Sequence, residues 1–226
     1  MINNKEYLAD NINEINKILS GPNIHEFFNI VFKEGISKYK EKLRVGGIYE
    51  IETYPAAKWF AKIQEIGNVI CNKKDFWPAG ISADVMLAQK IPVIKIKNII
   101  LTMKSAENID ILRKRPTKYM KQYSILNNGL TPQLEMVDYN LEKNLNELKL
   151  NLGAKYYGIL AYKLGSDNAL ENMQVVFLSD KANEIVHTVD IPIIKLDDKI
   201  AAEDKSLKDK IEENKGESLK AKIGLK

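Results

Sequence analysis

Three short segments in the last third of the chain constrain the fold most. Residues 156–164, 173–178 and 185–194 are rich in β-branched and aromatic residues, which favour strands. Their connections contain residues 165–168 and 179–183, whose Gly, Ser, Asp and Asn are typical of turns. A parallel neighbour would need a crossover of a dozen or more residues, which these connections are too short to supply. We therefore expect an antiparallel β-meander.

A leucine-rich stripe precedes these strands. Between Thr131 and Leu152 the apolar residues recur every three or four positions, as on one helix face: Leu134, Val137, Leu141, Leu145, Leu148 and Leu152. Thr131-Pro132 suits the start of a helix and Gly153 suits its end. The stripe predicts a long amphipathic helix packed on the meander. A groove for a partner helix is the alternative, and residues 134–139 could also begin as a strand.

The N-terminal region has helical periodicity in two adjacent segments. In residues 4–19 the apolar positions are spaced as on one helix face, and the same holds for residues 24–44. Gly21-Pro22 separates the two segments, because proline interrupts a helix and glycine relaxes the backbone. Gly46-Gly47 ends the second segment. This pattern predicts an N-terminal helical hairpin.

The middle region is mixed. Residues 49–52 alternate between apolar and acidic side chains, as in a half-buried strand. Residues 59–66 and 69–72 flank Gly67-Asn68 and are interpreted as a β-hairpin. A helix that begins at Pro55 is the competing interpretation, since proline is favoured at the first helical position.

Two further elements are expected before the leucine stripe. Residues 91–103 are rich in isoleucine and valine and predict one strand. Ser105 is a suitable N-cap for a short helix that ends near Arg115, because Pro116 follows.

These elements together predict an α+β fold. We divide the chain into residues 1–104 (helical hairpin plus strands), 105–195 (basic segment, long helix and meander) and 196–226, with 1–195 as a single domain in the alternative. The last segment contains eight Lys and eight Asp or Glu with few apolar residues. It cannot bury enough surface to fold firmly, so we expect a charged tail that is weakly ordered or helical.

Composition predicts a soluble, cytoplasmic protein that does not enter a membrane. Cys71 is the one cysteine of the chain, which fits a reducing compartment. The first twenty residues contain three acidic residues and lack the apolar run of a secretory signal. The most apolar segment, residues 91–103, is too short to span a bilayer and contains Lys95 and Lys97.

The sequence lacks the motifs on which several kinds of catalysis and cofactor binding depend. The sequence contains no P-loop, no dinucleotide-binding glycine motif and no nucleophile elbow. His25 and His187 are far apart and distant from Cys71, which is not the spacing of a zinc site. We therefore expect no cofactor and no metal, and we interpret Cys71 as a small apolar residue rather than a catalytic thiol.

The strongest candidate for binding is a local basic segment. Residues 90–122 contain nine Lys or Arg against two acids, whereas the whole chain has a net charge of only +4. Lysine and arginine can neutralise phosphates, and tyrosine rings can stack on unpaired bases. The candidate contacts are Arg113, Lys114, Arg115, Lys118, Tyr119, Lys121 and Tyr123. In the alternative interpretation these residues form a solvated helix end, with both tyrosines packed inward.

A second candidate lies in the segment that follows residue 72. Lys73 and Lys74 come shortly before Trp77, which stands in a Phe-Trp-Pro-Ala-Gly sequence. An exposed tryptophan beside two lysines would form a recognition loop. The alternative is a fixed turn that packs its aromatic rings into the core.

We expect a non-enzymatic binding or accessory protein that contacts nucleic acid or an acidic protein surface. The many Lys, Asn and Ile residues are associated with a bacterium of low GC content or its phage. Self-association into a homo-oligomer is left open, and so is a protein–protein module without an anionic ligand.

The enzymatic alternative is a metal-dependent phosphodiesterase or nuclease. It needs two or more acids around Mg²⁺, with a lysine near the phosphate. The candidate acids are Asp138, Asp167, Asp180 and Asp190. Asp138 with Glu147 and Lys149 imitates a nuclease motif, but on the predicted helix Glu147 and Lys149 point to different faces.

Overall fold

The computed structural model describes residues 4–46, 55–72, 81–86, 91–131, 145–147, 149, 151–166 and 168–194. The chain divides into two compact units, Met1–Ile193 and Ile194–Lys226, and the elements below belong to the first. Its helices are α1 (Asn4–Leu19), α2 (Pro22–Gly46), α4 (Pro55–Asn72), α5 (Asp110–Lys114), α6 (Lys118–Ser124) and the 3₁₀ helix η2 (Ile125–Leu130). Its strands are β1 (Ile81–Met86), β2 (Ile91–Ile96), β3 (Ile99–Ser105), β4 (Tyr156–Leu164), β5 (Leu170–Leu178) and β6 (Ile185–Asp190). The protein is of the α+β class.

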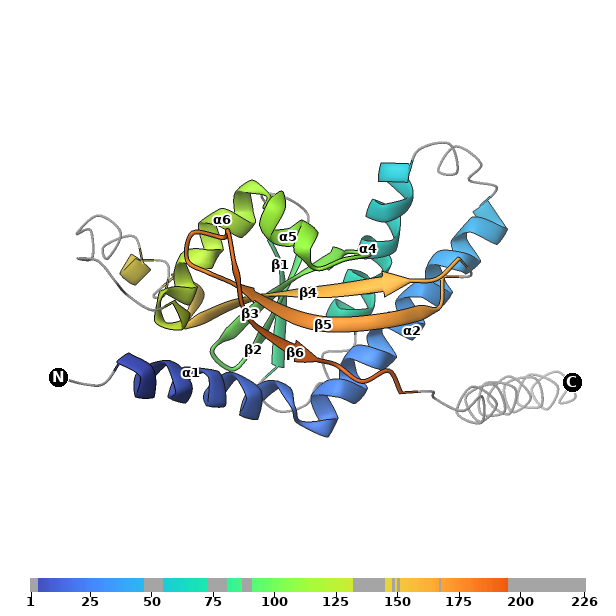
Figure 1. Ribbon diagram of the computed structural model, residues 1–226. Coiled ribbons are helices and arrows are strands. Elements are labelled where there is room, and N and C mark those ends of the chain that lie inside the picture. Colours follow the sequence, from blue (N-terminus) through green and yellow to red (C-terminus); the bar gives the residue numbers. More distant parts are fainter. Residues whose placement is uncertain are drawn as a thin grey trace, which may run out of the picture. The chain divides into compact units, whose positions relative to one another are not determined.

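The strands form one mixed sheet in the order β1-β2-β3-β4-β5-β6 (Figure 1). Neighbouring strands are antiparallel except for β3 and β4, which are parallel, with Ile99 opposite Tyr156. A parallel pair requires a long crossover. Residues 106–155 form this connection, and α5, α6 and η2 lie within it.

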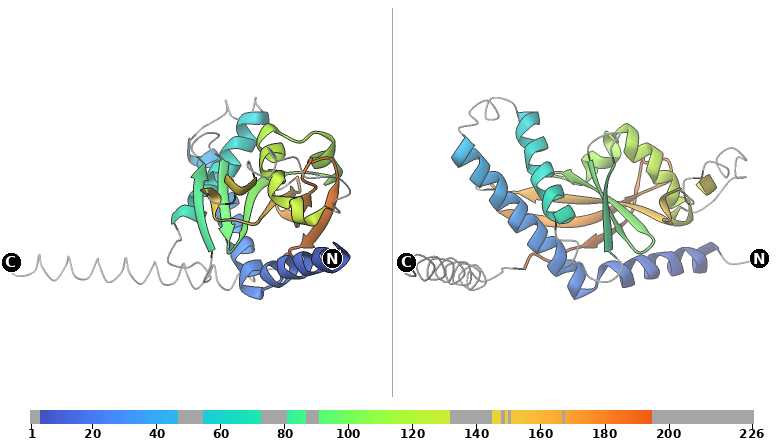
Figure 2. Two further views of the ribbon diagram at one scale, coloured as in Figure 1. Left: turned by 90° about the vertical axis from the view of Figure 1, so that its left-hand side faces the viewer. Right: turned by 180° about the vertical axis from the view of Figure 1, so that it is seen from behind.

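Alternating side chains of the central strands build two cores. On β4, Tyr156 and Tyr162 pack with the apolar residues of α1, α2 and α4, whereas Tyr157 and Ile159 pack with α5, α6 and η2. This alternation is the period of two that a strand imposes on its side chains. The sheet consequently lies between two helical layers (Figure 2).

The β-hairpin predicted around Gly67-Asn68 is wrong. Residues 55–72 form the single helix α4, as in the competing interpretation. Ile63, Ile66 and Ile70 are fully or almost fully buried, and their spacing of three and four residues is that of one helix face. Packing against α2 and the sheet overrides the β propensity of these branched side chains.

The single strand predicted over residues 91–103 is also wrong. The chain reverses at Lys97-Asn98, where Lys97 has φ +53°, and Ile96 pairs with Ile99 across this two-residue turn. Ser105 is the last residue of β3 and does not cap a helix, since α5 begins at Asp110. The β-branched residues on both sides of Lys97-Asn98 concealed the turn.

The N-terminal helices form, but not as a hairpin. α1 has the predicted bounds, yet α2 packs along α4, and α1 contacts η2 and β6 (Figure 1). Polar groups fix α1. Tyr156 Oη lies 2.7 Å from Glu14 Oε2, and Lys155 Nζ donates to the same oxygen at 2.8 Å. The hydrogen bond from Lys155 lowers the pKa of the Glu14 carboxyl.

Some predictions concern residues outside the described part of the chain. These are the strand at 49–52, most of the leucine stripe and the charged tail at 196–226. Residues 145–147, 149, 151 and 152 are helical, and Gly153 follows with φ +55°. The division of the chain at residues 104 and 195 stays a prediction. Among the described helices, none has the length and apolar character that crossing a membrane requires.

Gly35 offers a direct test of the packing of α2 on α4. A Cβ atom at residue 35 would lie 2.7 Å from the Cα atom of Ile66, so the two backbones would have to separate. We expect Gly35→Ala to lower the free energy of unfolding by about 1–3 kcal/mol, the cost of overpacking. Urea denaturation measures this loss.

Gly21→Ala is the matched control. The nearest atom to its added Cβ is Ile24 Cγ1 at 3.7 Å, an ordinary contact. Stability equal to the wild type in both variants would show that α2 and α4 do not pack this closely.

Candidate nucleic-acid interface

The basic segment folds into two short helices joined at a proline. The Asn108 side chain accepts a hydrogen bond from the Asp110 N–H at 2.8 Å, which satisfies a free donor at the start of α5. Arg115 precedes Pro116 and leaves the helical conformation, with φ −137° and ψ 60°. α6 begins after Thr117, whose backbone is extended.

Buried side chains anchor both helices to the sheet. Leu112 and Met120 are each 1% exposed. The ring of Tyr123 lies 5.5 Å from that of Tyr157, whose hydroxyl forms a 2.7 Å hydrogen bond with Thr102 Oγ1. Burial raises the pKa of the Tyr157 hydroxyl well above its ordinary value. The helices therefore present a fixed outer surface.

The predicted stacking role of Tyr119 and Tyr123 is wrong. Their exposed fractions are 8% and 6%, so neither ring offers a face to a base. Desolvation by burial raises the pKa of both hydroxyls. The tyrosines are four residues apart and share the inner face of α6 with Met120, which is the inward packing of the alternative interpretation.

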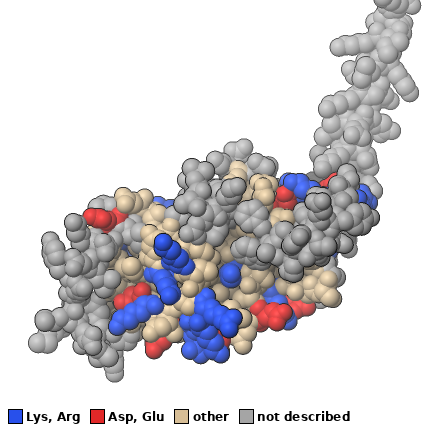
Figure 3. Space-filling view, turned by 90° about the horizontal axis from the view of Figure 1, so that it is seen from above, with Lys and Arg blue, Asp and Glu red and all other residues tan. Residues whose placement is uncertain are grey.

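The cations lie on the opposite side of these helices. Lys114, Arg115, Lys118 and Lys121 are exposed, and we call these four residues the basic face. Figure 3 shows Lys and Arg side chains gathered on the side of the molecule that α5 and α6 cover. Arg113 differs, because its Nε donates to Asp110 Oδ1 at 2.9 Å and this contact lowers the pKa of Asp110.

A buried amide locks the end of this region onto the sheet. Asn127 of η2 is fully buried, and its Nδ2 donates to the carbonyl oxygens of Tyr157 and Leu178, both at 2.8 Å. The Tyr157 N–H donates to Asn127 Oδ1 at 2.9 Å. One side chain thus satisfies three buried main-chain groups on β4 and β5. This contact fixes the crossover after α6.

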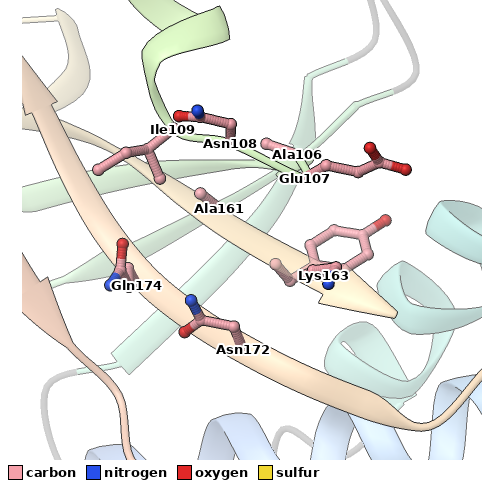
Figure 4. Close-up of a pocket in the computed structure, with 9 residues that line it drawn as sticks. Ala106, Glu107, Asn108, Ile109, Ala161, Lys163, Asn172 and Gln174 are labelled. Atoms are coloured by element: carbon pink, nitrogen blue, oxygen red, sulfur yellow. The ribbon is translucent and has the colours of Figure 1, made fainter. Parts of the chain in front are cut away.

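A cavity of about 300 Å³ lies beside the start of α5 (Figure 4). Ala161 and Lys163 of β4 and Asn172 and Gln174 of β5 face the loop of residues 106–109 across it. The register pairs Ala161 with Gln174 and Lys163 with Asn172, so these four residues share one face of the sheet. The cavity is at the carboxyl ends of the parallel strands, where ligands bind in open α/β sheets.

The cavity walls are polar but carry little net charge. Lys163 Nζ lies 2.8 Å from Glu171 Oε2, and this hydrogen bond raises the pKa of the lysine. Gln174 Nε2 donates to Asp190 Oδ1 at 2.7 Å, and Asn172 is exposed. Ile109, which lines the cavity, directly precedes α5. The cavity and the basic face therefore meet at one short helix.

Several other sequence candidates fall in parts of the chain that the structure does not describe. Lys73, Lys74 and Trp77 lie outside the described residues, as do Asp138 and Asp167.

The titratable groups singled out in the sequence are dispersed. His187 Nε2 is 2.8 Å from Asn16 Oδ1, and burial lowers the pKa of this histidine. Cys71 is a half-buried free thiol at the end of α4. Glu147 and Lys149 are in helical conformation, as the periodicity predicted, and not on a strand. Among the side chains that the structure describes, no three His, Cys, Asp or Glu residues gather as a metal site would require.

Asp180 and Asp190 do not converge. Asp180 lies in the turn after β5, whereas Asp190 is at the far end of β6. The five residue steps from Ile185 to Asp190 span about 16 Å at strand geometry. Asp180 and Asp190 therefore do not supply the pair of converging acids that the phosphodiesterase alternative requires, and Asp138 and Asp167 lie outside the described residues.

Two features of this region were not predicted from the sequence. Asn127 stands in an Asn-Asn-Gly sequence that is typical of a turn, so its role as a buried clamp had no visible signal. Asn172 and Gln174 alternate along a strand segment, which was a weak signal for one shared face. Their proximity to residues 106–109 depends on the order of strands in the sheet.

Comparisons with protein-family models, curated proteins and solved structures found no match for this chain. The function is therefore inferred from the geometry of the site.

Asn127→Ala tests the clamp that positions the crossover. The substitution removes hydrogen bonds from three buried main-chain groups, and each unsatisfied group costs about 1–3 kcal/mol. We expect the free energy of unfolding to fall by about 3 kcal/mol or more. Thermal or urea unfolding measures the loss.

Asn13→Ala, at an exposed position of α1, is the control and should change stability little. Equal stability of the two variants would contradict the clamp.

Proposed function

We propose that this protein binds nucleic acid through the basic face of α5 and α6. The proposal depends on one observation: the charged and the apolar side chains of this region lie on opposite sides of the helices. Lys114, Arg115, Lys118 and Lys121 point to solvent, while the apolar and aromatic residues between them anchor the helices to the sheet. Cations held on a rigid surface can contact successive phosphates without a large entropic cost of ordering.

The local excess of charge supports this proposal. Between residues 110 and 124 the chain has five Lys or Arg and one Asp, and Arg113 is engaged with that Asp. The other four cations are exposed and form no salt bridge with a residue that the structure describes, so they can contact an external anion. Phosphate contacts of this kind dominate the affinity of sequence-independent nucleic-acid binding. Because both tyrosines are buried, charge rather than stacking on α6 would supply the binding energy.

An acidic protein surface is the other anion considered from the sequence. Nucleic acid is favoured because a cavity with hydrogen-bonding amides adjoins the basic face, and an acidic peptide has no need of it. The test below separates these partners by including a polyglutamate peptide.

Charge reversal of the basic face tests the proposal. We expect the triple variant Lys114→Glu, Arg115→Glu and Lys118→Glu to bind a fluorescein-labelled single strand at least tenfold more weakly, measured by anisotropy. The wild-type affinity should fall steeply with salt, by about 0.7 log units per tenfold salt increase for each phosphate neutralised.

Three exposed cations on the other helical layer provide the control. Lys17→Glu, Lys40→Glu and Arg44→Glu change the net charge equally but lie on α1 and α2. Equal weakening by both triple variants would mean that net charge, and not the basic face, drives binding. Tight binding of polyglutamate with no binding of the strand would assign the face to an acidic protein.

A metal-dependent phosphodiesterase is the second candidate function, and the backbone register gives it one specific observation. Asp84 of β1 pairs with Val93 of β2, and Val93 pairs with Thr102 of β3. Lys104 follows two residues later on β3, and Glu107 lines the cavity. Carboxylates and a lysine are the groups that Mg²⁺-dependent cleavage uses, and this candidate requires these three residues to gather near the carboxyl end of β3.

Asp84→Asn and Lys104→Ala test this second candidate. If the chain cleaves nucleic acid, we expect Mg²⁺-dependent degradation of the labelled strand that both variants lose and that Asp180→Asn retains. Gel electrophoresis of the products measures it. Cleavage that persists in Asp84→Asn would exclude this residue from the chemistry.

A further inference from the structure

The cavity at the carboxyl ends of β3 and β4 has a surface of unusual composition. Ala106, Ile109 and Ala161 supply apolar area, and Asn108, Asn172 and Gln174 supply amide groups. Amides both donate and accept hydrogen bonds, and they are the side chains that pair with the edge of adenine. A neutral, flat and hydrogen-bonding ligand fits this lining.

The charges around the cavity argue against an anion inside it. Lys163 is paired with Glu171, and Glu107 adds a carboxylate to the rim. Lys163 is the one cation among the described residues that line the cavity, so a phosphate placed here would meet the Glu107 carboxylate without an unpaired cation to offset it. The anionic part of a ligand therefore belongs on the basic face and its neutral part in the cavity.

The distance between the two sites suits one continuous strand. Ile109 lines the cavity, and Lys114 is five residues further along, so α5 separates them by about 7.5 Å at 1.5 Å per residue. A base in the cavity and a phosphate on the basic face can therefore belong to neighbouring nucleotides. A volume of about 300 Å³ is at the lower limit of small-molecule sites and admits one base rather than a base pair.

We propose that the cavity receives one unpaired base of a single-stranded nucleic acid whose phosphates lie on the basic face. This inference rests on the proposed nucleic-acid binding and specifies its substrate class. The Asn172 amide reads the edge of the base together with Gln174, whose carbonyl oxygen and second N–H are not used in its hydrogen bond to Asp190 Oδ1. Ile109 and the two alanines pack on the ring of the base. Duplex nucleic acid is excluded from the cavity because its bases are paired.

The test compares two labelled strands of equal length, a short oligodeoxyadenylate and the same backbone without bases. The wild type should bind the base-bearing strand about tenfold more tightly, as expected when one base buries apolar surface and forms hydrogen bonds with two amides. In the double variant Asn172→Leu with Gln174→Met, side-chain size is nearly kept and the amides are lost. We expect this variant to bind both strands equally. Its affinity should equal that of the wild type for the abasic strand.

The control repeats these two substitutions on the other helical layer. Gln64→Met with Asn68→Leu alters exposed residues of α4 and should keep the tenfold preference. Circular dichroism checks that the double variant folds as the wild type does.

The outcomes separate this inference from the proposed function. If the wild type binds both strands equally and charge reversal still abolishes binding, the basic face binds nucleic acid but the cavity does not hold a base. A preference that persists in the Asn172 and Gln174 double variant also overturns the inference. Failure of the wild type to bind either strand overturns the proposed function, and the inference with it.

Discussion

The parallel pairing of β3 with β4 is the constraint on which the rest of the structure depends. Every other pair in the sheet is antiparallel and is joined by a short connection, whereas this pair needs a crossover that returns the chain to the same end of the sheet. Residues 106–155 form that crossover and carry the most basic part of the sequence. The pairing therefore decides where the cations are presented, and it brings residues 106–109 over β4 and β5.

The crossover is held by contacts of two kinds. Apolar and aromatic side chains of α5 and α6 fill the core on one face of the sheet, and Asn127 satisfies main-chain groups of β4 and β5. Burial of a polar amide is favourable only when its hydrogen bonds are made, so the clamp also fixes the position of η2. Opposite this layer, α1 is held by hydrogen bonds of Glu14 with Lys155 and Tyr156 at the start of β4.

The candidate site follows from what the crossover covers and what it leaves open. α5 and α6 cover β4 around Tyr157 and Ile159, but beyond Ala161 the same face of the sheet is only partly covered. Polar side chains occupy that uncovered area, as a half-exposed sheet face requires. The sequence located the cations between Lys114 and Lys121, because an excess of Lys and Arg can be counted along the chain without knowledge of the fold. It could not show that Tyr119 and Tyr123 turn inward or that a cavity adjoins Ile109.

Local patterns in the sequence determined the α+β class, the bounds of α1 and β4, and the position of the basic segment. Each depends on neighbours within a few residues, through helical or strand periodicity and charge density. The tertiary structure decided the choice of helix for residues 55–72, because the buried face of α4 packs on α2 and outweighs strand propensity. It also decided the parallel pair, the Asn127 clamp and the cavity, since these join residues from 30 to more than 50 positions apart. Contacts over such separations have no periodic signature, so only the folded chain reveals them.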